Sequence, residues 1–124
     1  MKRFFRGMDT SISAGIGRWI PIMAAVILTA KLGRIQFNGH DETYYNLNMS
    51  NIVERADQVF NVSDMYWIRE DGCKMYGPFI IVAANWKEHP FGSVVETSRG
   101  TGLVLDTGDF ARKEPQTIDL AVEW

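Results

Sequence analysis

Hydrophobic residues recur at spacings of three and four over residues 49–60 (MSNIVERADQVF), and the period shortens in the rest of the chain. The first pattern predicts a short amphipathic helix with Ser50 as its N-cap. Beyond this helix, apolar and alternating segments are separated by glycine, proline and aspartate, which is typical of short strands joined by tight turns. The expected strands are residues 64–69, 79–84, 93–97, 103–105 and 117–124. Several short strands at close spacing indicate an all-β fold, a small barrel, rather than a helical fold.

Turn residues indicate where these strands end. Residues 70–72 (EDG) predict a hairpin turn, and residues 98–102 (SRGTG) predict a glycine turn. Residues 79–84 (FIIVAA) are continuously apolar, which suits a strand buried on both faces, whereas residues 117–124 alternate and suit a half-buried strand. Residues 33–48 show no clear period, and we expect a linker there, with a first strand leading into the barrel.

An uncharged run of 12 residues, 19–30 (WIPIMAAVILTA), lies between Arg18 and Lys31. As a helix it spans about 18 Å, which is short of the ~30 Å hydrocarbon core of a bilayer. The length and the basic residues before it match a signal peptide, although Leu28 is large for a cleavage site. An uncleaved membrane anchor and a buried helix of a soluble protein are the other readings. Export places residues 38–124 outside the cytoplasm.

The charge is distributed unevenly along the chain. The net charge of −2 conceals a balance of +5 over residues 1–37 and of −7 over the remainder. A basic, partly apolar head and an acidic body argue against nucleic acid as a partner and favour contact of the N-terminus with a membrane. We therefore divide the chain into a signal peptide or membrane anchor (1–37), a linker with a short amphipathic helix (38–65) and a β-barrel (66–124).

Cofactor chemistry finds little support in the sequence. Cys73 is the only cysteine, so neither an intramolecular disulfide nor a multi-cysteine metal site can form. His40 and His89 lie far apart without a cluster of ligands, and we expect no metal and no other cofactor. A mature domain of roughly 85 residues buries limited apolar area, so a homodimer is one assembly to consider.

Four short motifs follow one another in the last part of the chain. They are residues 82–93 (VAANWKEHPFGS), 100–102 (GTG), 106–108 (DTG) and 118–120 (IDL). In this order and near this spacing they resemble the three-aspartate (3D) domains of peptidoglycan lytic transglycosylases and stationary-phase-survival muralytic proteins. The resemblance implies a six-stranded double-psi β-barrel. It also implies cleavage of the β-1,4 bond between N-acetylmuramic acid (MurNAc) and N-acetylglucosamine (GlcNAc) without water, which leaves a 1,6-anhydromuramyl end.

By position, Asp119 matches the family's catalytic acid/base and Asp106 matches its supporting carboxylate. A carboxylic acid first protonates the leaving glycosidic oxygen, and the resulting carboxylate accepts the proton of the C6 hydroxyl as that oxygen attacks C1. The wide carboxylate spacing of an inverting hydrolase is unnecessary because no water is activated. Such a group must keep its proton near neutral pH, and apolar neighbours such as Ile118 and Leu120 favour this.

The chain departs from the family pattern at two places. Asn85 stands where the first family aspartate is expected, and the connection over residues 109–116 is longer than in the family and lacks glycine. The substrate-binding residues implied by the resemblance are Asn85, Trp86, Thr107, Gly108 and Asp109. Each prediction has a plainer structural alternative, and His89 is expected to lie in a surface loop.

Two plainer alternatives concern the aspartates themselves. Asp106 could cap a turn with its carboxylate, and Asp119 could be an outward-facing strand residue. The leading expectation is a secreted or membrane-anchored lytic transglycosylase that acts on peptidoglycan glycan strands. The alternatives are a catalytically inactive cell-wall-binding barrel and a structural barrel of an envelope or phage assembly.

Overall fold

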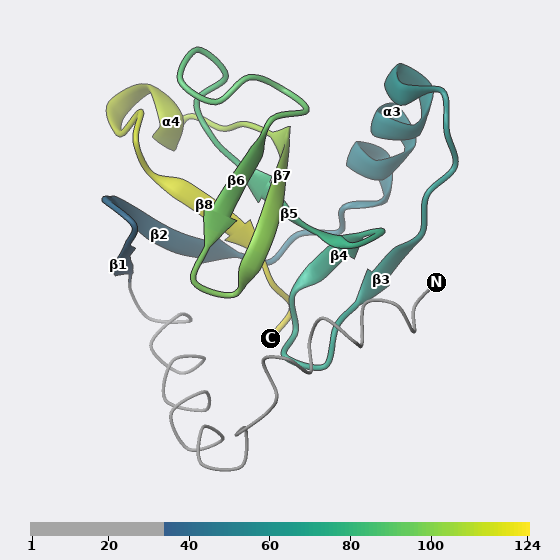
Figure 1. Ribbon diagram of the computed structural model, residues 1–124, viewed down its shortest axis with the longest axis horizontal. Helices are drawn as coiled ribbons and strands as arrows, with labels where there is room; N and C mark the ends of the chain where they lie inside the picture. Colours follow the sequence, from purple (N-terminus) through teal and green to yellow (C-terminus); the bar gives the residue numbers. More distant parts are fainter. Residues whose placement is uncertain (1–33) are drawn as a thin grey trace.

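The computed structural model describes residues 34–124, which form one eight-stranded sheet with two helices (Figure 1). The signal peptide or anchor expected over residues 1–37 lies almost wholly outside the described residues. No helix in the described part is long and apolar enough to cross a membrane. The strands are β1 (Ile35–Phe37), β2 (His40–Tyr45), β3 (Tyr66–Ile68), β4 (Lys74–Tyr76), β5 (Phe79–Ala83), β6 (Val94–Thr97), β7 (Gly100–Asp106) and β8 (Ile118–Ala121). The helices are α3 (Ser50–Phe60) and α4 (Phe110–Lys113).

The mostly-strand architecture with one short amphipathic helix is confirmed. The helix expected over residues 49–60 is α3, but the prediction of Ser50 as its N-cap was wrong, because Ser50 is the first helical residue and Met49 is the N-cap. Each of the five segments predicted from the hydrophobic pattern forms strand, and β7 extends beyond the predicted residues 103–105 at both ends. The single-turn helix α4 was not predicted. It occupies the connection over residues 109–116 that departs from the family pattern.

Strand order places the last strand of the chain in the middle of the sheet. The order is β1-β2-β8-β5-β4-β3, and β7 pairs with β5 and carries β6 on its other side. The pairs β2–β8 and β5–β7 are parallel, whereas β5 and β8 are antiparallel. In Figure 1 the β6–β7 hairpin crosses the middle of the view, with α3 and α4 on opposite sides of it. As a result, β5 has β7 along one edge and both β4 and β8 along the other.

Two segments differ from the sequence-based expectation. Residues 33–48 contain a β1–β2 hairpin, whose turn residues Asn38 and Gly39 both have positive φ (52° and 85°). An Asn-Gly pair with this backbone is the preferred two-residue hairpin connection. The glycine turn predicted over residues 98–102 is shorter in the structure. The chain turns at Ser98 and Arg99 alone, and β7 begins at Gly100.

Buried side chains form two clusters, one on each face of the sheet, because successive strand residues point to opposite faces. One cluster comprises Tyr44, Cys73, Met75, Ile80, Val82, Ala84, Val104, Ile118, Leu120 and Val122. The other comprises Met49, Val53, Ala56, Tyr76, Ile81, Leu103, Leu105 and Ala121. Helix α3 covers the second cluster with Val53 and Ala56, so the helix buries one face of β5, β7 and β8.

Candidate functional site

Four residues from four neighbouring strands lie in one row across the sheet. Ala83 of β5 is the register partner of Asp106 in β7 on one side and of Asp119 in β8 on the other. Asp119 is in turn the partner of Thr43 in β2. The β5–β7 register shifts by one residue between Val82 and Ala83, so Asp106 rather than its neighbour stands opposite Ala83. Local pairing therefore brings the two predicted catalytic aspartates to the same level of the sheet.

Asp119 is a half-buried carboxyl with one hydrogen bond from a side chain. Thr43 Oγ1 donates to Asp119 Oδ1 at 2.7 Å. Burial raises the pKa of Asp119 to about 6, the charge of Asp106 adds to the increase, and the Thr43 hydrogen bond opposes it. A carboxyl group with this pKa is partly protonated near neutral pH, as an acid catalyst requires.

Asp106 is held by two donors, one on each carboxylate oxygen. The Tyr45 hydroxyl donates to Oδ2 at 3.0 Å, and the Thr107 backbone N–H donates to Oδ1 at 2.8 Å. Burial and the neighbouring charge of Asp106 raise the pKa of Tyr45, so its phenol keeps the proton that it donates. Asp106 therefore has a fixed orientation, whereas only one oxygen of Asp119 has a side-chain partner among the described residues.

Trp86 extends the site beyond Asp106. Its indole Nε1 donates to the Asp106 carbonyl oxygen at 3.0 Å, and its ring packs edge-on against Phe91 with 5.5 Å between centroids. The side chain is 38% exposed despite these contacts. Trp86 thus offers solvent an apolar, nearly fixed ring beside the carboxylate pair.

Asn85 has a structural role in the loop after β5. Its Oδ1 accepts hydrogen bonds from the backbone N–H groups of Lys87 (2.7 Å) and Glu88 (3.2 Å), and its Nδ2 donates to the Ala111 carbonyl at 2.9 Å. The amide therefore shapes its own loop and ties that loop to α4. These contacts occupy both ends of the amide that the resemblance assigned to substrate.

The last three predicted binding residues lie in the connection after β7. Thr107 contributes its backbone N–H to Asp106, and Gly108 is exposed next to Phe110. Asp109 is 95% exposed at its side chain and pairs with Arg112 at 2.9 Å. None of the contacts found in residues 34–124 joins Asp109 to either aspartate of the row.

Sequence reasoning missed the contribution of β2. Thr43 and Tyr45 lie two residues apart on the same face of this strand. Their hydroxyl groups donate hydrogen bonds to Asp119 and Asp106, respectively. The Asn38-Gly39 turn signal was present in the sequence and would have indicated a hairpin there. The pairing of β2 with β8, however, joins residues 76 positions apart and has no local signal.

The fold and the row define a β-rich domain with two carboxylates set on either side of a central strand. No group of three or more potential metal ligands occurs among residues 34–124. No family model, no curated protein and no solved structure matches the chain. The function therefore has to be argued from the site itself.

Proposed function

We propose that this protein is a peptidoglycan lytic transglycosylase in which Asp119 is the catalytic acid and then base. The observation that carries the proposal is the half-buried Asp119 carboxyl, with its pKa raised to about 6, at the same level of the sheet as Asp106. Two carboxyl groups with different surroundings are the usual means of cleaving a glycosidic bond.

The reaction needs one proton donor that is regenerated within the cycle. Protonated Asp119 gives its proton to the glycosidic oxygen as the bond from that oxygen to C1 of MurNAc breaks. The C6 hydroxyl oxygen of the same sugar then bonds to C1, and its proton passes to the Asp119 carboxylate. Thr43 occupies Oδ1, which leaves Oδ2 to carry the transferred proton. Water is not consumed, and the product ends in a 1,6-anhydro ring.

Asp106 supplies negative charge where the sugar becomes positive. Cleavage passes through an oxocarbenium-like state, which a nearby carboxylate stabilises electrostatically. The hydrogen bonds from Tyr45 and Thr107 fix the position of this charge before substrate arrives. Trp86 supplies a ring face against which the apolar side of a sugar can stack, as part of the same binding surface.

The proposal includes the closed form of the fold and the location of the chain. We take the sheet to be a six-stranded double-psi barrel with additional strands. The two parallel pairs, β2–β8 and β5–β7, joined through antiparallel β5–β8, support this. We take residues 1–37 to be a signal peptide or membrane anchor, so that residues 38–124 act outside the cytoplasm on peptidoglycan glycan strands.

A glycan-binding barrel without catalytic activity is the second candidate. The contacts of Asn85 favour it, because the residue that replaces the first family aspartate is engaged with its own loop and α4. Two carboxylates and the Trp86 ring are then sufficient for binding a sugar. The site lacks the third carboxylate of the family pattern, because Asn85 stands in its place.

The test is digestion of purified sacculi by the full chain, with the soluble products analysed by mass spectrometry. Anhydromuropeptides that disappear with Asp119→Asn and persist with Asp109→Asn support the transglycosylase. The second variant removes a carboxylate of the same type from an exposed position outside the row. Products that contain an added water contradict the proposal in favour of a hydrolase. Binding without soluble product supports the non-catalytic barrel, and neither binding nor product leaves a structural role.

A further inference from the structure

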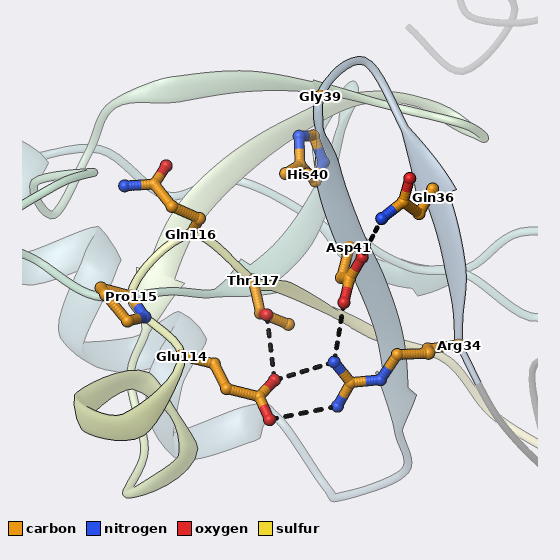
Figure 2. A pocket seen from close by; sticks show the side chains of 9 residues that line it. All are labelled: Arg34, Gln36, Gly39, His40, Asp41, Glu114, Pro115, Gln116 and Thr117. Atoms are coloured by element: carbon orange, nitrogen blue, oxygen red, sulfur yellow. Dashed lines mark hydrogen bonds and ion pairs between the residues drawn. The ribbon is translucent and has the colours of Figure 1, made fainter.

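A pocket of about 330 Å³, lined mostly by polar and charged residues, lies between the β1–β2 hairpin and the segment that precedes β8 (Figure 2). Its lining residues are Arg34, Gln36, Gly39, His40, Asp41, Glu114, Pro115, Gln116 and Thr117. The pocket exists because β2 pairs with β8 only from Glu42 and Ile118 onward. Before that point the hairpin and the 114–117 segment diverge.

A chain of hydrogen bonds runs along one side of this pocket. Arg34 Nη1 donates to Asp41 Oδ2 and to Glu114 Oε1, each at 2.9 Å, and so joins the hairpin to the segment before β8. Gln36 donates to Asp41 at 2.9 Å, and Thr117 donates to Glu114 at 3.1 Å. Figure 2 shows these contacts as one continuous line from Gln36 through Asp41, Arg34 and Glu114 to Thr117. The charged side chains are therefore held in place without a ligand.

The pocket lies on the face of the sheet that carries Asp119. Asp41 precedes Thr43 by two residues in β2, and Thr117, just before β8, precedes Asp119 by two residues. Residues two apart in a strand share a face and are about 7 Å apart. Trp86 lies at the other end of the row, beside Asp106. The pocket, Asp119, Asp106 and the Trp86 ring thus follow one another across the sheet.

The chemistry of the pocket suits a hydroxyl-rich ligand that carries no negative charge. Arg34 pairs with the carboxylates of both Asp41 and Glu114, so these three side chains carry one positive and two negative charges and disfavour an anionic group. Gln36 and Gln116 each donate one hydrogen bond from nitrogen, to Asp41 and to Glu88, while their amide oxygens accept none of the hydrogen bonds found in the described residues. Planar amide and carboxylate groups suit the hydroxyls of a sugar ring. Pro115 is the only wholly apolar side chain of the lining, but the apolar atoms of the lining residues expose more surface to the pocket than the polar atoms do, which leaves room for the C–H face of a sugar ring as well as for its hydroxyls.

We propose that this pocket is a subsite for a sugar ring of the glycan strand, next to the bond that is cleaved at Asp119. The identity of the glycan rests on the proposed function, whereas the binding of a sugar by Gln36 and Gln116 rests on the pocket. The strand then lies along one continuous surface, with sugar rings in the pocket, over the carboxylate pair and against Trp86.

The experiment measures equilibrium binding of the full chain to two probes, intact sacculi and glycan strands freed of their peptides by an amidase. Gln36→Ala and Gln116→Ala each remove one amide group from the pocket. Loss of one hydrogen bond weakens binding by about 3- to 10-fold, and we expect this loss with both probes. Gln58→Ala is the matched control, because Gln58 is exposed on α3 and outside the pocket. Unchanged melting temperatures show that the variants remain folded.

Each outcome decides the subsite separately from the reaction. Unchanged affinity in both glutamine variants overturns the subsite, even where anhydromuropeptides form. A loss confined to intact sacculi overturns it in favour of a site for the peptide. A loss on peptide-free strands with no anhydromuropeptide from the unaltered chain supports the subsite and contradicts the transglycosylase. Failure of the unaltered chain to bind either probe overturns both proposals.

Discussion

Asp106 and Asp119 stand on opposite sides of the same residue, Ala83, as its register partners in β7 and β8. Their backbones are two strand spacings apart, about 10 Å, and their side chains are close enough for the charge of Asp106 to raise the pKa of Asp119. The two surroundings are unequal, since Asp106 accepts hydrogen bonds from Tyr45 and Thr107 whereas Asp119 accepts one from Thr43. Because burial and the charge of Asp106 raise the pKa of Asp119, we expect Asp119 to be the carboxyl group that donates a proton to the substrate.

The rate of glycan cleavage should fall as the pH rises through about 6. The reaction requires protonated Asp119, whose pKa burial and Asp106 raise to about 6. Initial rates of anhydromuropeptide release across this range measure the effect. Thr43→Val removes the hydrogen bond that lowers this pKa and should move the profile to higher pH, whereas Thr43→Ser should leave it in place. A profile that is flat between about pH 5 and pH 8 contradicts the assignment of Asp119 as the acid.

Asp119→Asn should stabilise the fold at neutral pH. The unfolded chain releases the Asp119 proton near pH 4, whereas the folded chain keeps it until about pH 6. Between these values the folded state binds more protons than the unfolded state, so stability falls as the pH rises and stays lower above pH 6. Allowing for screening of this partly exposed group, we expect Asn to add about 1–2 kcal/mol at about pH 8 and little at about pH 4. Urea unfolding at the two pH values measures it, and an equal effect at both would refute the shift.

Tyr45→Phe should reduce activity more than its effect on stability explains. The substitution removes the donor to Asp106 Oδ2 and frees that carboxylate to rotate. A hydrogen bond to a charged group contributes about 1.5–3 kcal/mol, and a misplaced stabilising charge slows the reaction by roughly 10-fold or more. Tyr76→Phe is the matched control because it removes a comparable bond, from Tyr76 to Asp57 at 2.6 Å. The control should lower the free energy of unfolding and leave the rate of the folded protein unchanged. Equal rates for both variants would reduce Tyr45 to a structural residue.

Asn85→Asp should not improve the site, although it restores the first aspartate of the family that the sequence resembles. Asn85 Nδ2 donates to the Ala111 carbonyl, and a carboxylate would place an oxygen against that carbonyl instead. Such a loss costs about 1–3 kcal/mol, and α4 loses its link to the loop after β5. Thermal unfolding and the digestion assay measure the two effects. Increased cleavage with unchanged stability would show that the residue faces substrate after all.

Gly102→Ala should destabilise the β5–β7 pairing that carries Asp106. A Cβ at this position would lie 2.9 Å from Val82 Cγ1 and 3.3 Å from Thr97 Cγ2. Overpacking of this kind costs about 1–3 kcal/mol. Combining it with Val82→Ala removes the closest clash, so the double variant should lose less free energy of unfolding than the sum of the single variants. If the losses in free energy of unfolding are additive, the strain of Gly102→Ala does not come from contact with Val82.

Local sequence patterns predicted the elements but not the arrangement that makes the site. Helix α3 and strand β5 have strong periods and clear boundaries, so both were predicted nearly in full. The turn around Ser98 was placed too far along the chain because Gly100 and Gly102 resemble turn residues. The structure instead uses Gly102 where β5 and β7 approach closely.

The sequence predicted the aspartates of β7 and β8 and the nearby Trp86, but not the part of the candidate site that β2 contributes. Asp106 and Asp119 were identified through motifs, whereas Thr43 and Tyr45 lie in a segment expected to be largely linker. Their positions depend on the parallel β2–β8 pairing, which the residues of neither strand reveal alone. Asn85, in contrast, was named from its position in a motif. That position does not indicate whether the amide faces a ligand or, as in the structure, binds its own loop and α4.

The place of β8 in the sheet has a consequence for the order of events during synthesis. Residues 118–121 leave the ribosome after every other strand of the described sheet, yet they lie between β2 and β5. In a nascent chain without residues 118–121, β2 and β5 each lack β8 as a pairing strand, and Thr43 has no Asp119 to bind. The two carboxylates therefore come together only when β8 has been synthesised and has inserted between β2 and β5, so any chemistry of the row is withheld until then.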